Sequence, residues 1–392
     1  MPFFDHNATV PLHADARRAW LEVADRVWHN PSGLYAGATA ARVALDDARD
    51  RLADLLDCDP HRIVFTGGAT AANNLLACHV GRTAPAGARA LVSAIEHPCV
   101  AEPFADAFPG RVDSIPVDSR GVVRVDVIES LLDARAAETA IVTVMAASNE
   151  SGTIQPWREI AATCRHRGVP FHTDAAQWLG KLPARGFGGC DWVTGSGHKF
   201  GGPRGVGFIV VPEGERAFRG DRGGPQEGGR HAGTEDVASI AAMVAALEAR
   251  EQEIAGRVES LAAGRDAAER RLRDVLPEAV VVGAASQRLW NTLAILVPGA
   301  DGKKLVARLD RAGIEASTGA ACSSGSDATA RIASAIGASV LGVGDRDLRG
   351  MVRLSGGWDT TAEEWLAAVE ALAAAARDRD HGPPRVSLTA RP

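Results

Sequence analysis

Short apolar runs alternate with helical patterns over the first three-fifths of the chain. The periodicity predicts strands at about 62–66, 90–94, 140–145, 169–174, 191–194 and 205–211, and helices at about 69–80 and 156–167. Strands that alternate with helices favour a mainly parallel sheet with helices on both faces. Such sheets bind ligands beyond the carboxyl ends of their strands. We therefore expect an α/β protein whose functional side chains follow its strands.

Helical patterns also lie outside this alternating region. Two helices are expected at about 15–28 and 39–56, the second with alanine and leucine at intervals of three and four residues. A stretch rich in alanine and glutamate, from about 234 to 275, is predicted to connect a large domain to a smaller one. The remainder predicts a strand, a helix, a loop rich in glycine and serine, another strand, and a final helix at 361–377.

Composition narrows the functional class. The 392 residues are 46% hydrophobic and 23% charged, as is typical of a globular enzyme, and the net charge of -6 argues against a nucleic-acid-binding surface. The N-terminus lacks the pattern of a signal peptide, and no apolar run is long enough for a membrane helix. The six cysteines form no C-x-x-C pair. We therefore expect reduced thiols, no metal site, no membrane association and a cytoplasmic location.

The most specific local motif is Ser196-Gly197-His198-Lys199-Phe200-Gly201-Gly202-Pro203, which follows the predicted strand at 191–194. A lysine directly after a strand, with small neighbours, suits a Schiff base with pyridoxal phosphate (PLP), because a planar cofactor can approach it. Ser196 and His198 can donate hydrogen bonds to a phosphate. The alternative interpretation is a surface lysine in a glycine-rich turn.

Two further segments suit the same cofactor. Asp174 ends the predicted strand at 169–174, and a buried carboxylate there needs a positive or hydrogen-bonding partner. A protonated PLP ring nitrogen is such a partner and keeps the ring an electron sink; a helix cap is the alternative. The segment Thr66-Gly67-Gly68-Ala69-Thr70 supplies a strand end, two glycines and a helix N-terminus, which together can bind a phosphate.

More motifs follow one another along almost the whole chain. They are Asp5-His6-Asn7-Ala8-Thr9, Asn30-Pro31-Ser32, Glu96-His97-Pro98, Asn149-Glu150-Ser151-Gly152, the segment 196–203, Ala232-Gly233-Thr234-Glu235, the segment 317–325 and Arg353-Leu354-Ser355. With these motifs the chain resembles the cysteine desulfurases, a branch of the class V aminotransferases. The resemblance implies the PLP-dependent transferase fold type I, with a mainly parallel seven-stranded sheet in a large domain and a smaller α+β C-terminal domain.

The resemblance also divides the chain and assigns the reaction centre. It implies a large PLP-binding domain over 14–255, a small domain made of 1–13 and 256–380, and a loose tail at 381–392. Lys199 would carry the cofactor and move protons at the substrate carbon, and Asp174 would pair with the ring nitrogen. His97 would stack on the ring and act as an acid or base. The ring hydroxyl would be bonded by Gln177 and Asn149.

The phosphate and the substrate have their own implied contacts. The phosphate would be held by Ala69, Thr70, Ser196, His198 and, from the neighbouring subunit, Thr234. That last contact makes the site depend on a homodimer. The substrate would be bound by Arg353, Asn149 and Asn7, and the planar fork of Arg353 suits a carboxylate.

Cys322 determines the predicted reaction. It lies among glycine, alanine and serine residues, a composition expected of a mobile loop. A thiolate there can attack the sulfur of a bound cysteine and leave as a persulfide. The implied activity is therefore conversion of L-cysteine to L-alanine, with delivery of the sulfur to an acceptor protein. The acceptor stays open among an iron–sulfur cluster scaffold, a tRNA-thiolation carrier and a biosynthetic partner. A free cysteine without a role is the alternative.

Some positions depart from the family pattern. They include Tyr35, Ala71, Ser148 and the segment Gly356-Gly357-Trp358-Asp359 after the expected carboxylate clamp. Because of Trp358, we keep open a related PLP enzyme that acts on a modified amino acid: a C–S lyase, a selenocysteine lyase or an aminotransferase. A non-catalytic binding subunit or sulfur-relay scaffold is the third alternative, and the intact Lys199 and Asp174 argue against it.

Overall fold

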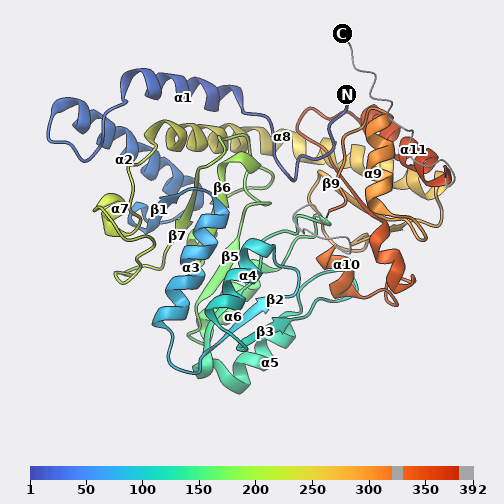
Figure 1. Ribbon diagram of the computed structural model, residues 1–392, viewed down its shortest axis with the longest axis horizontal. Helices are drawn as coiled ribbons and strands as arrows, with labels where there is room; N and C mark the ends of the chain where they lie inside the picture. The colour runs from blue at the N-terminus through green and yellow to red at the C-terminus, as the bar shows by residue number, and fades with distance from the viewer. Residues whose placement is uncertain (320–329, 379–392) are drawn as a thin grey trace, which may run out of the picture.

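The computed structural model describes residues 1–319 and 330–378. Its larger sheet has the strand order β1-β7-β6-β5-β4-β2-β3. The strands are β1 (Ile63–Thr66), β2 (Arg89–Ser93), β3 (Val112–Ile115), β4 (Thr139–Thr143), β5 (Phe171–Asp174), β6 (Trp192–Ser196) and β7 (Gly207–Val210). Neighbours from β3 to β6 pair in parallel, and only β7 runs against β6 and β1. The predicted seven-stranded, mainly parallel sheet is confirmed (Figure 1).

Helices cover both faces of this sheet because each strand buries side chains on both sides. On one face, Val64 and Ile141 pack with α3 (Ala69–Thr83) and α4 (Pro98–Ala107). On the other face, Phe65 and Val142 pack with α2 (Ala36–Leu56), α6 (Trp157–His166) and the first part of α8 (Val237–Val275). Helix α1 (Ala14–Arg26) packs on α8, and α5 (Val125–Arg135) precedes β4.

A second, three-stranded antiparallel sheet has the order β10-β9-β8. Its strands are β8 (Val280–Val281), β9 (Thr292–Leu296) and β10 (Met351–Ser355), and α9 (Gly302–Arg311) and α11 (Ala362–Arg377) pack on one side. The other side meets α10 (Arg331–Ile336) together with Ile95 and Met145 of the larger sheet's connections. The two sheets therefore share a packed boundary.

The N-terminal segment and α8 connect the two parts. Asp5 bridges to Ser355 at the end of β10, and Phe4 belongs to the core of the smaller sheet. Helix α8 contributes Ile240 to the core of the larger sheet and Leu272 to that of the smaller one. Figure 1 shows α8 running from one part to the other. The proposed domain boundaries at 13/14 and 255/256 stay a prediction, and the predicted loose tail lies outside the described residues.

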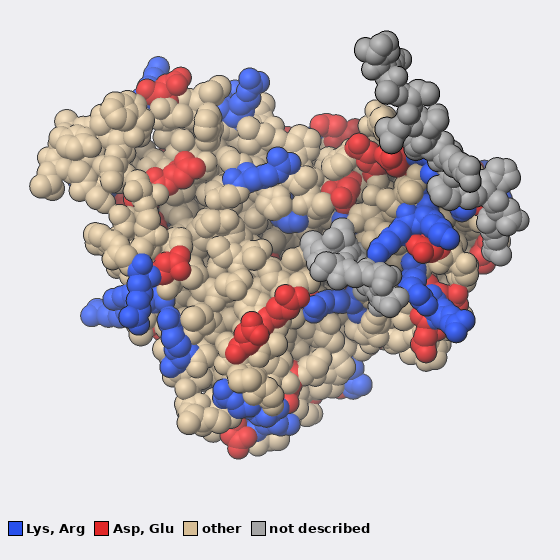
Figure 2. All heavy atoms as spheres, viewed as in Figure 1, with Lys and Arg blue, Asp and Glu red and all other residues tan. Residues whose placement is uncertain are grey.

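The sequence did not predict several elements, among them α4, β3 and α5. Helix α4 begins with proline and carries Pro103 inside, so its sequence lacks a helical signature. Strand β3 lies at the sheet edge and reads Val-Asp-Ser-Ile with little burial, so it shows no apolar run. Helix α5 was not predicted either. Within 1–319 and 330–378, no helix is long and apolar enough to cross a membrane. Acidic and basic side chains are interspersed over the face shown in Figure 2.

Candidate active site

The carboxyl ends of β4, β5 and β6 and the N-terminus of α3 meet at a cavity of about 300 Å³. Segments from both ends of the chain complete its wall, since residues near the N-terminus and from β10 also line it. Most of the predicted site residues lie on this one cavity: Asn7, Ala69, Thr70, His97, Asn149, Asp174, Gln177, Ser196, His198, Lys199 and Arg353.

Strand pairing explains how Lys199 reaches the cavity. Asp174 ends β5 and pairs with Thr194 of β6, and β6 continues to Ser196. A 3-10 turn over Gly197–Lys199 then carries the lysine to the cavity. Its Nζ donates to the backbone oxygens of Asn7 and Ala8, at 2.9 and 2.8 Å. The N-terminal segment thus holds the Lys199 amine at the carboxyl end of the parallel strands.

One end of the cavity suits a phosphate. Gly68 caps α3 with φ of +117° and offers no side chain, so the first N–H groups of the helix keep no capping partner. A side chain at Gly68 would be strained, and its Cβ would come within 3.6 Å of Ser196 Oγ. The backbone of Ala69 and Thr70 and the hydroxyl of Ser196 therefore form a polar cradle at a helix N-terminus, where anions bind favourably.

His198 lies beside this cradle in an uncharged state. Burial, and then the nearby positive charges of Lys199 and Arg204, lower its pKa to about 4. Its Nδ1 is 3.1 Å from Thr9 Oγ1. A neutral ring that bonds Thr9 through one nitrogen keeps the other available for a phosphate oxygen.

Asp174 is a buried carboxylate, 6% exposed, whose hydrogen bonds within the described chain come from neutral groups. Asn73 Nδ2 donates to Oδ2 at 3.0 Å, and the backbone of Ala176 donates to Oδ1 at 2.9 Å. Asn73 is in turn fixed by Thr194 Oγ1, which donates to its Oδ1 at 2.8 Å. The carboxylate is held in a fixed position and has no cationic partner among the described residues. It can therefore pair with a protonated ring nitrogen.

His97 lies at the start of α4 on the same cavity. Its Nδ1 accepts a hydrogen bond from the backbone of Cys99 at 3.1 Å, so the neutral ring carries its proton on Nε2. Burial lowers the pKa of His97, while the charge of Asp174 opposes that shift. The ring can therefore exchange protons at Nε2, the atom that the helix cap leaves free.

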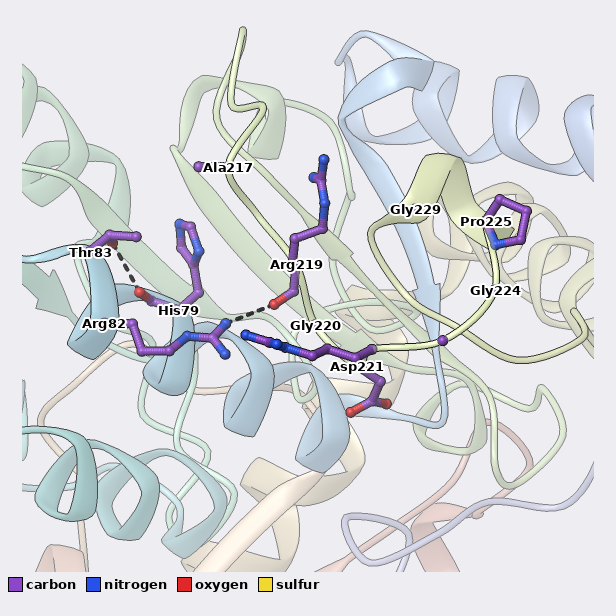
Figure 3. Close-up of a pocket in the computed structure, with 12 residues that line it drawn as sticks. His79, Arg82, Thr83, Ala217, Arg219, Gly220, Asp221, Gly224, Pro225 and Gly229 are labelled. Atoms are coloured by element: carbon purple, nitrogen blue, oxygen red, sulfur yellow. Dashed lines mark hydrogen bonds between the residues drawn. The ribbon is translucent and has the colours of Figure 1, made fainter.

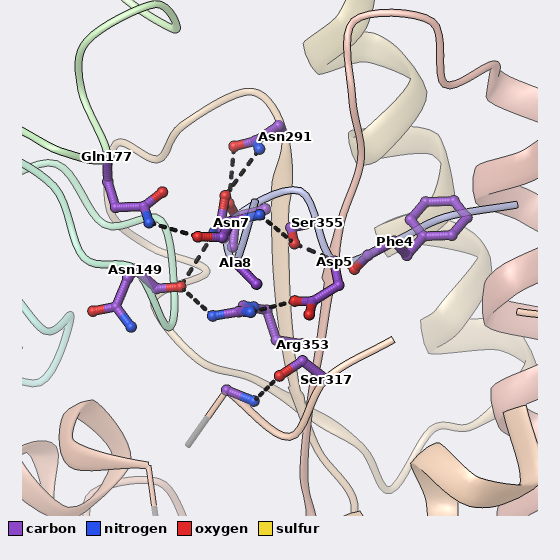
Figure 4. A network of polar contacts seen from close by, with 12 residues as sticks. Phe4, Asp5, Asn7, Ala8, Asn149, Gln177, Asn291, Ser317, Arg353 and Ser355 are labelled. Carbon is purple, nitrogen blue, oxygen red and sulfur yellow. Dashed lines mark hydrogen bonds and ion pairs between the residues drawn. The ribbon is translucent and has the colours of Figure 1, made fainter. Parts of the chain in front are cut away.

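Arg353 is 3% exposed and lies on β10. One terminal nitrogen donates to the backbone oxygen of Asn149 at 2.8 Å, and the other pairs with Asp5 (Figure 4). Its Nε is buried and has no hydrogen-bond partner among residues 1–319 and 330–378. Because Arg353 lines the cavity, this donor gives a carboxylate a bond that the protein itself does not satisfy.

The carboxamide of Asn7 is committed to the protein interior. It bonds Asn149 O and Asn291 (Figure 4), and also Thr292 Oγ1 and Lys181. The backbone oxygen of Asn7 accepts from Lys199 and Gln177. The predicted substrate contact of Asn7 is therefore not one that its side chain is arranged to make. Asn149 uses its backbone oxygen in this network, and its side chain has no described hydrogen bond.

Among the described residues, the predicted site residue Thr234 does not lie on this cavity. Thr234 lines a separate cavity of about 170 Å³ with Gly67 and Glu235. Cys322 lies outside the described residues, and Gly319, three positions before it, lines the active cavity. The roles of both residues stay predictions.

Trp358 does not face the cavity, which corrects the interpretation placed on it. It is 7% exposed and packs edge-on against Trp290 at 4.9 Å, with Arg250 and Arg257 over its ring. Gly357 is required beside it, because a Cβ there would come within 2.3 Å of His6. The unusual segment therefore builds the packing between α8 and the end of β10, and it gives no support to a modified substrate.

Several residues of the site were not predicted from the sequence. They are Asn73, Cys99, Met145 and Lys181. Helical spacing could have indicated Asn73, which lies one turn after Ala69 on α3. Cys99 lines the cavity with its Sγ 4.0 Å from Asp174 Oδ2, and burial raises its pKa to about 12.

A larger cavity of about 690 Å³ lies elsewhere, around His79, Arg82 and the loop at 217–229 (Figure 3). Arg82 there donates to the backbone oxygen of Arg219. The described residues that line this larger cavity include neither a lysine nor a buried carboxylate. The predicted chemistry therefore belongs to the smaller cavity.

Comparison with known proteins agrees with this geometry. The family described as aminotransferase class-V matches residues 2–366. A cysteine desulfurase IscS of Dictyoglomus turgidum is 31% identical over 92% of this chain and 91% of its own. A cysteine desulfurase of Gluconacetobacter diazotrophicus is 36% identical over 83% of this chain and 82% of its own. A solved NifS-like protein is 28% identical with a TM-score of 0.84, over 95% of this chain and 98% of that one. The chain belongs to the cysteine desulfurase family of class-V aminotransferases.

Proposed function

We propose that the protein is a PLP-dependent cysteine desulfurase, which converts L-cysteine to L-alanine and takes the sulfur onto Cys322 as a persulfide. One observation carries the proposal: Lys199, Asp174, His97 and Arg353 line a single cavity together with Gly319. Cys322 is three residues beyond Gly319, and three residues span at most about 11 Å. Chain length therefore keeps the thiol within reach of the bound substrate.

The cofactor, when bound, supplies an electron sink at the substrate α-carbon. Lys199 would carry it, Asp174 would hold its ring nitrogen protonated, and the cradle at Ala69 and Ser196 would hold its phosphate. These groups fit the cofactor because they provide an amine, an unpaired buried carboxylate and open helix N–H groups on one cavity.

The protein's own groups account for sulfur transfer. Arg353 would bind the substrate carboxylate through Nε, and Lys199 and His97 would move protons at the α-carbon and at the leaving side. The Cys322 thiolate would attack the substrate sulfur, forming an S–S bond as the C–S bond breaks. The electron pair stays on the substrate β-carbon, which takes up a proton to give alanine. The persulfide would then pass to a sulfur-acceptor protein.

Release of sulfide and alanine from L-cysteine, with a thiol reductant present, tests this proposal. We expect equal amounts of both products from the wild type. Cys322→Ala should lose this turnover while keeping the visible absorbance of the bound cofactor, and Lys199→Ala should lose both. Cys78→Ala is a matched control, because Cys78 is exposed and lies away from the cavity. Full turnover by Cys322→Ala would contradict the persulfide step.

The proposal includes a homodimer in which Thr234 completes the partner's phosphate site. Two observations support it. Thr234 lies off the cavity of its own chain, and three large apolar side chains in the connection between α1 and α2 are exposed: Trp28 at 73%, Leu34 at 100% and Tyr35 at 54%.

Subunit mixing tests the shared site. Lys199→Ala and Thr234→Ala proteins should each be weak alone, since each homodimer has two defective sites. After the two proteins exchange subunits, the mixed dimer should hold one site with both an intact Lys199 and an intact Thr234, so activity should reappear. Activity that stays at the sum of the two parents would overturn the shared site.

A further inference from the structure

Lys181 is a buried amine with no described acidic partner. It is 4% exposed, and it is one of four lysines in the chain, of which Lys199 is another. Its Nζ donates to two amide oxygens, Asn7 Oδ1 at 2.9 Å and Gln177 Oε1 at 2.5 Å. Among residues 1–319 and 330–378 it forms no ion pair. Burial, and then the charges of Lys199 and Arg353, lower its pKa well below the ordinary value.

An uncharged amine matches this environment. It has two N–H groups and one lone pair, and Lys181 has two acceptors to which those N–H groups can donate. A charged ammonium would leave one buried N–H without a partner and would place a positive charge close to Lys199 and Arg353.

These bonds fix the orientation of the Gln177 carboxamide. Its Oε1 faces Lys181, and its Nε2 donates to the backbone oxygen of Asn7 at 2.9 Å. If the amide turned over, two donors would meet at Lys181 and two acceptors would meet at Asn7. The amide nitrogen carries a second hydrogen, and Gln177 lines the cavity. That second N–H is therefore presented to the cavity.

Asn7 is locked in the same way. Its Oδ1 accepts from Lys181 and from Asn291 Nδ2 at 3.0 Å, while its Nδ2 donates to Thr292 Oγ1 and to Asn149 O (Figure 4). Both amides thus have one orientation that satisfies their neighbours, and Lys181 is the donor that they share.

We propose that Lys181, as a neutral donor, is a positioning residue that turns a Gln177 N–H toward the ring-hydroxyl oxygen of the bound cofactor. The inference rests on the proposed function, because it places the cofactor on Lys199. Lys181 itself does not line the cavity, so it acts through Gln177. An N–H donated to that oxygen favours its anionic form and so sets the pH at which the cofactor chromophore titrates.

A set of four variants tests the inference by pH titration of the visible absorbance of the cofactor-loaded enzyme. Lys181→Met and Gln177→Ala should each move the titration midpoint upward by about one pH unit, the effect of one lost hydrogen bond. The double variant should match Gln177→Ala alone, because Lys181 acts only through that amide. Lys181→Gln, which keeps a neutral donor, should titrate near the wild type. Lys304→Met, on the exposed side of α9, is the matched control.

The outcomes separate clearly. A midpoint unchanged in Lys181→Met, or shifts that add in the double variant, would overturn the inference. A Lys181→Met protein that loses stability without a change in midpoint would show that the lysine is purely structural, and this would also overturn the inference. If Lys181→Met does not fold, Lys181→Ala is measured against the same expectation. Failure of both variants to fold would likewise overturn the inference. Failure of the proposed function looks different: the wild-type absorbance would then survive Lys199→Ala.

Discussion

Acidification is expected to destabilise the protein through the buried His172. The ring is buried in β5, two residues before Asp174, with Nδ1 2.7 Å from Thr143 Oγ1 and Nε2 3.2 Å from Thr194 Oγ1. Burial alone lowers its pKa from 6.5 to about 3. The folded state therefore keeps this histidine neutral over a range in which the unfolded chain binds a proton.

The sign and size of the effect follow from linkage. Because the folded pKa is lowered, the unfolded state binds more protons below pH 6.5, so stability is present above that pH and is lost as the pH falls toward 3. With these two pKa values, lowering the pH from about 7.5 to 5 costs about 2 kcal/mol of unfolding free energy from this residue. Below pH 3 the cost reaches about 5 kcal/mol.

Urea unfolding at pH 7.5 and pH 5, followed by circular dichroism, measures this cost. The fall in unfolding free energy should be about 2 kcal/mol smaller in His172→Gln, which replaces the ring with a neutral amide, than in the wild type. His166→Gln, on the exposed face of α6, is the matched control and should behave as the wild type does. An equal fall in wild type and His172→Gln would refute the reasoning.

Three further predictions concern the site and its support. Asp174→Asn should lower kcat/KM for sulfide release by at least about 100-fold with the cofactor still bound, because an amide does not hold the ring nitrogen protonated; near-normal turnover would contradict the assignment. Arg353→Lys should raise KM for L-cysteine about tenfold or more, because a lysine cannot bond Asn149 and Asp5 and also offer the Nε–H donor to the substrate. An unchanged KM would remove Arg353 from the carboxylate site. Trp358→Ala should lower the free energy of unfolding by about 3 kcal/mol, measured by urea unfolding, but leave KM within about twofold of the wild-type value. A large change in KM with unchanged stability would show instead that Trp358 takes part in substrate recognition.

Most of the larger sheet could be predicted because its strands are short apolar runs with polar residues directly after them. Lys199 and Asp174 stood out for that reason, since each follows or ends such a run. Strand β3 could not be predicted, because a strand at the sheet edge buries few side chains and keeps a mixed sequence. Helix α4 was hidden because Pro103 lies inside it, where proline normally ends a helix.

The supporting contacts of the site were out of reach for a different reason. Lys181 bonds Asn7 across 174 positions, and Arg353 pairs with Asp5 across 348. No local sequence pattern predicts a contact between residues so far apart in the chain. The sequence around a loop lysine also does not indicate whether its side chain is buried or exposed to solvent. Trp358 was misjudged because sequence proximity to Arg353 was taken for proximity in space, although successive side chains near a strand face opposite ways.

The central claim is that Lys199 and Cys322 work together to take sulfur from L-cysteine. Mass spectrometry of the peptide that contains Cys322, after the cofactor-loaded protein meets L-cysteine without reductant, tests it most directly. The account predicts one added sulfur atom on Cys322 in the wild type and none in Lys199→Ala. Alanine accumulating while Cys322 stays unmodified, or the added sulfur appearing on Cys99 instead, would contradict it.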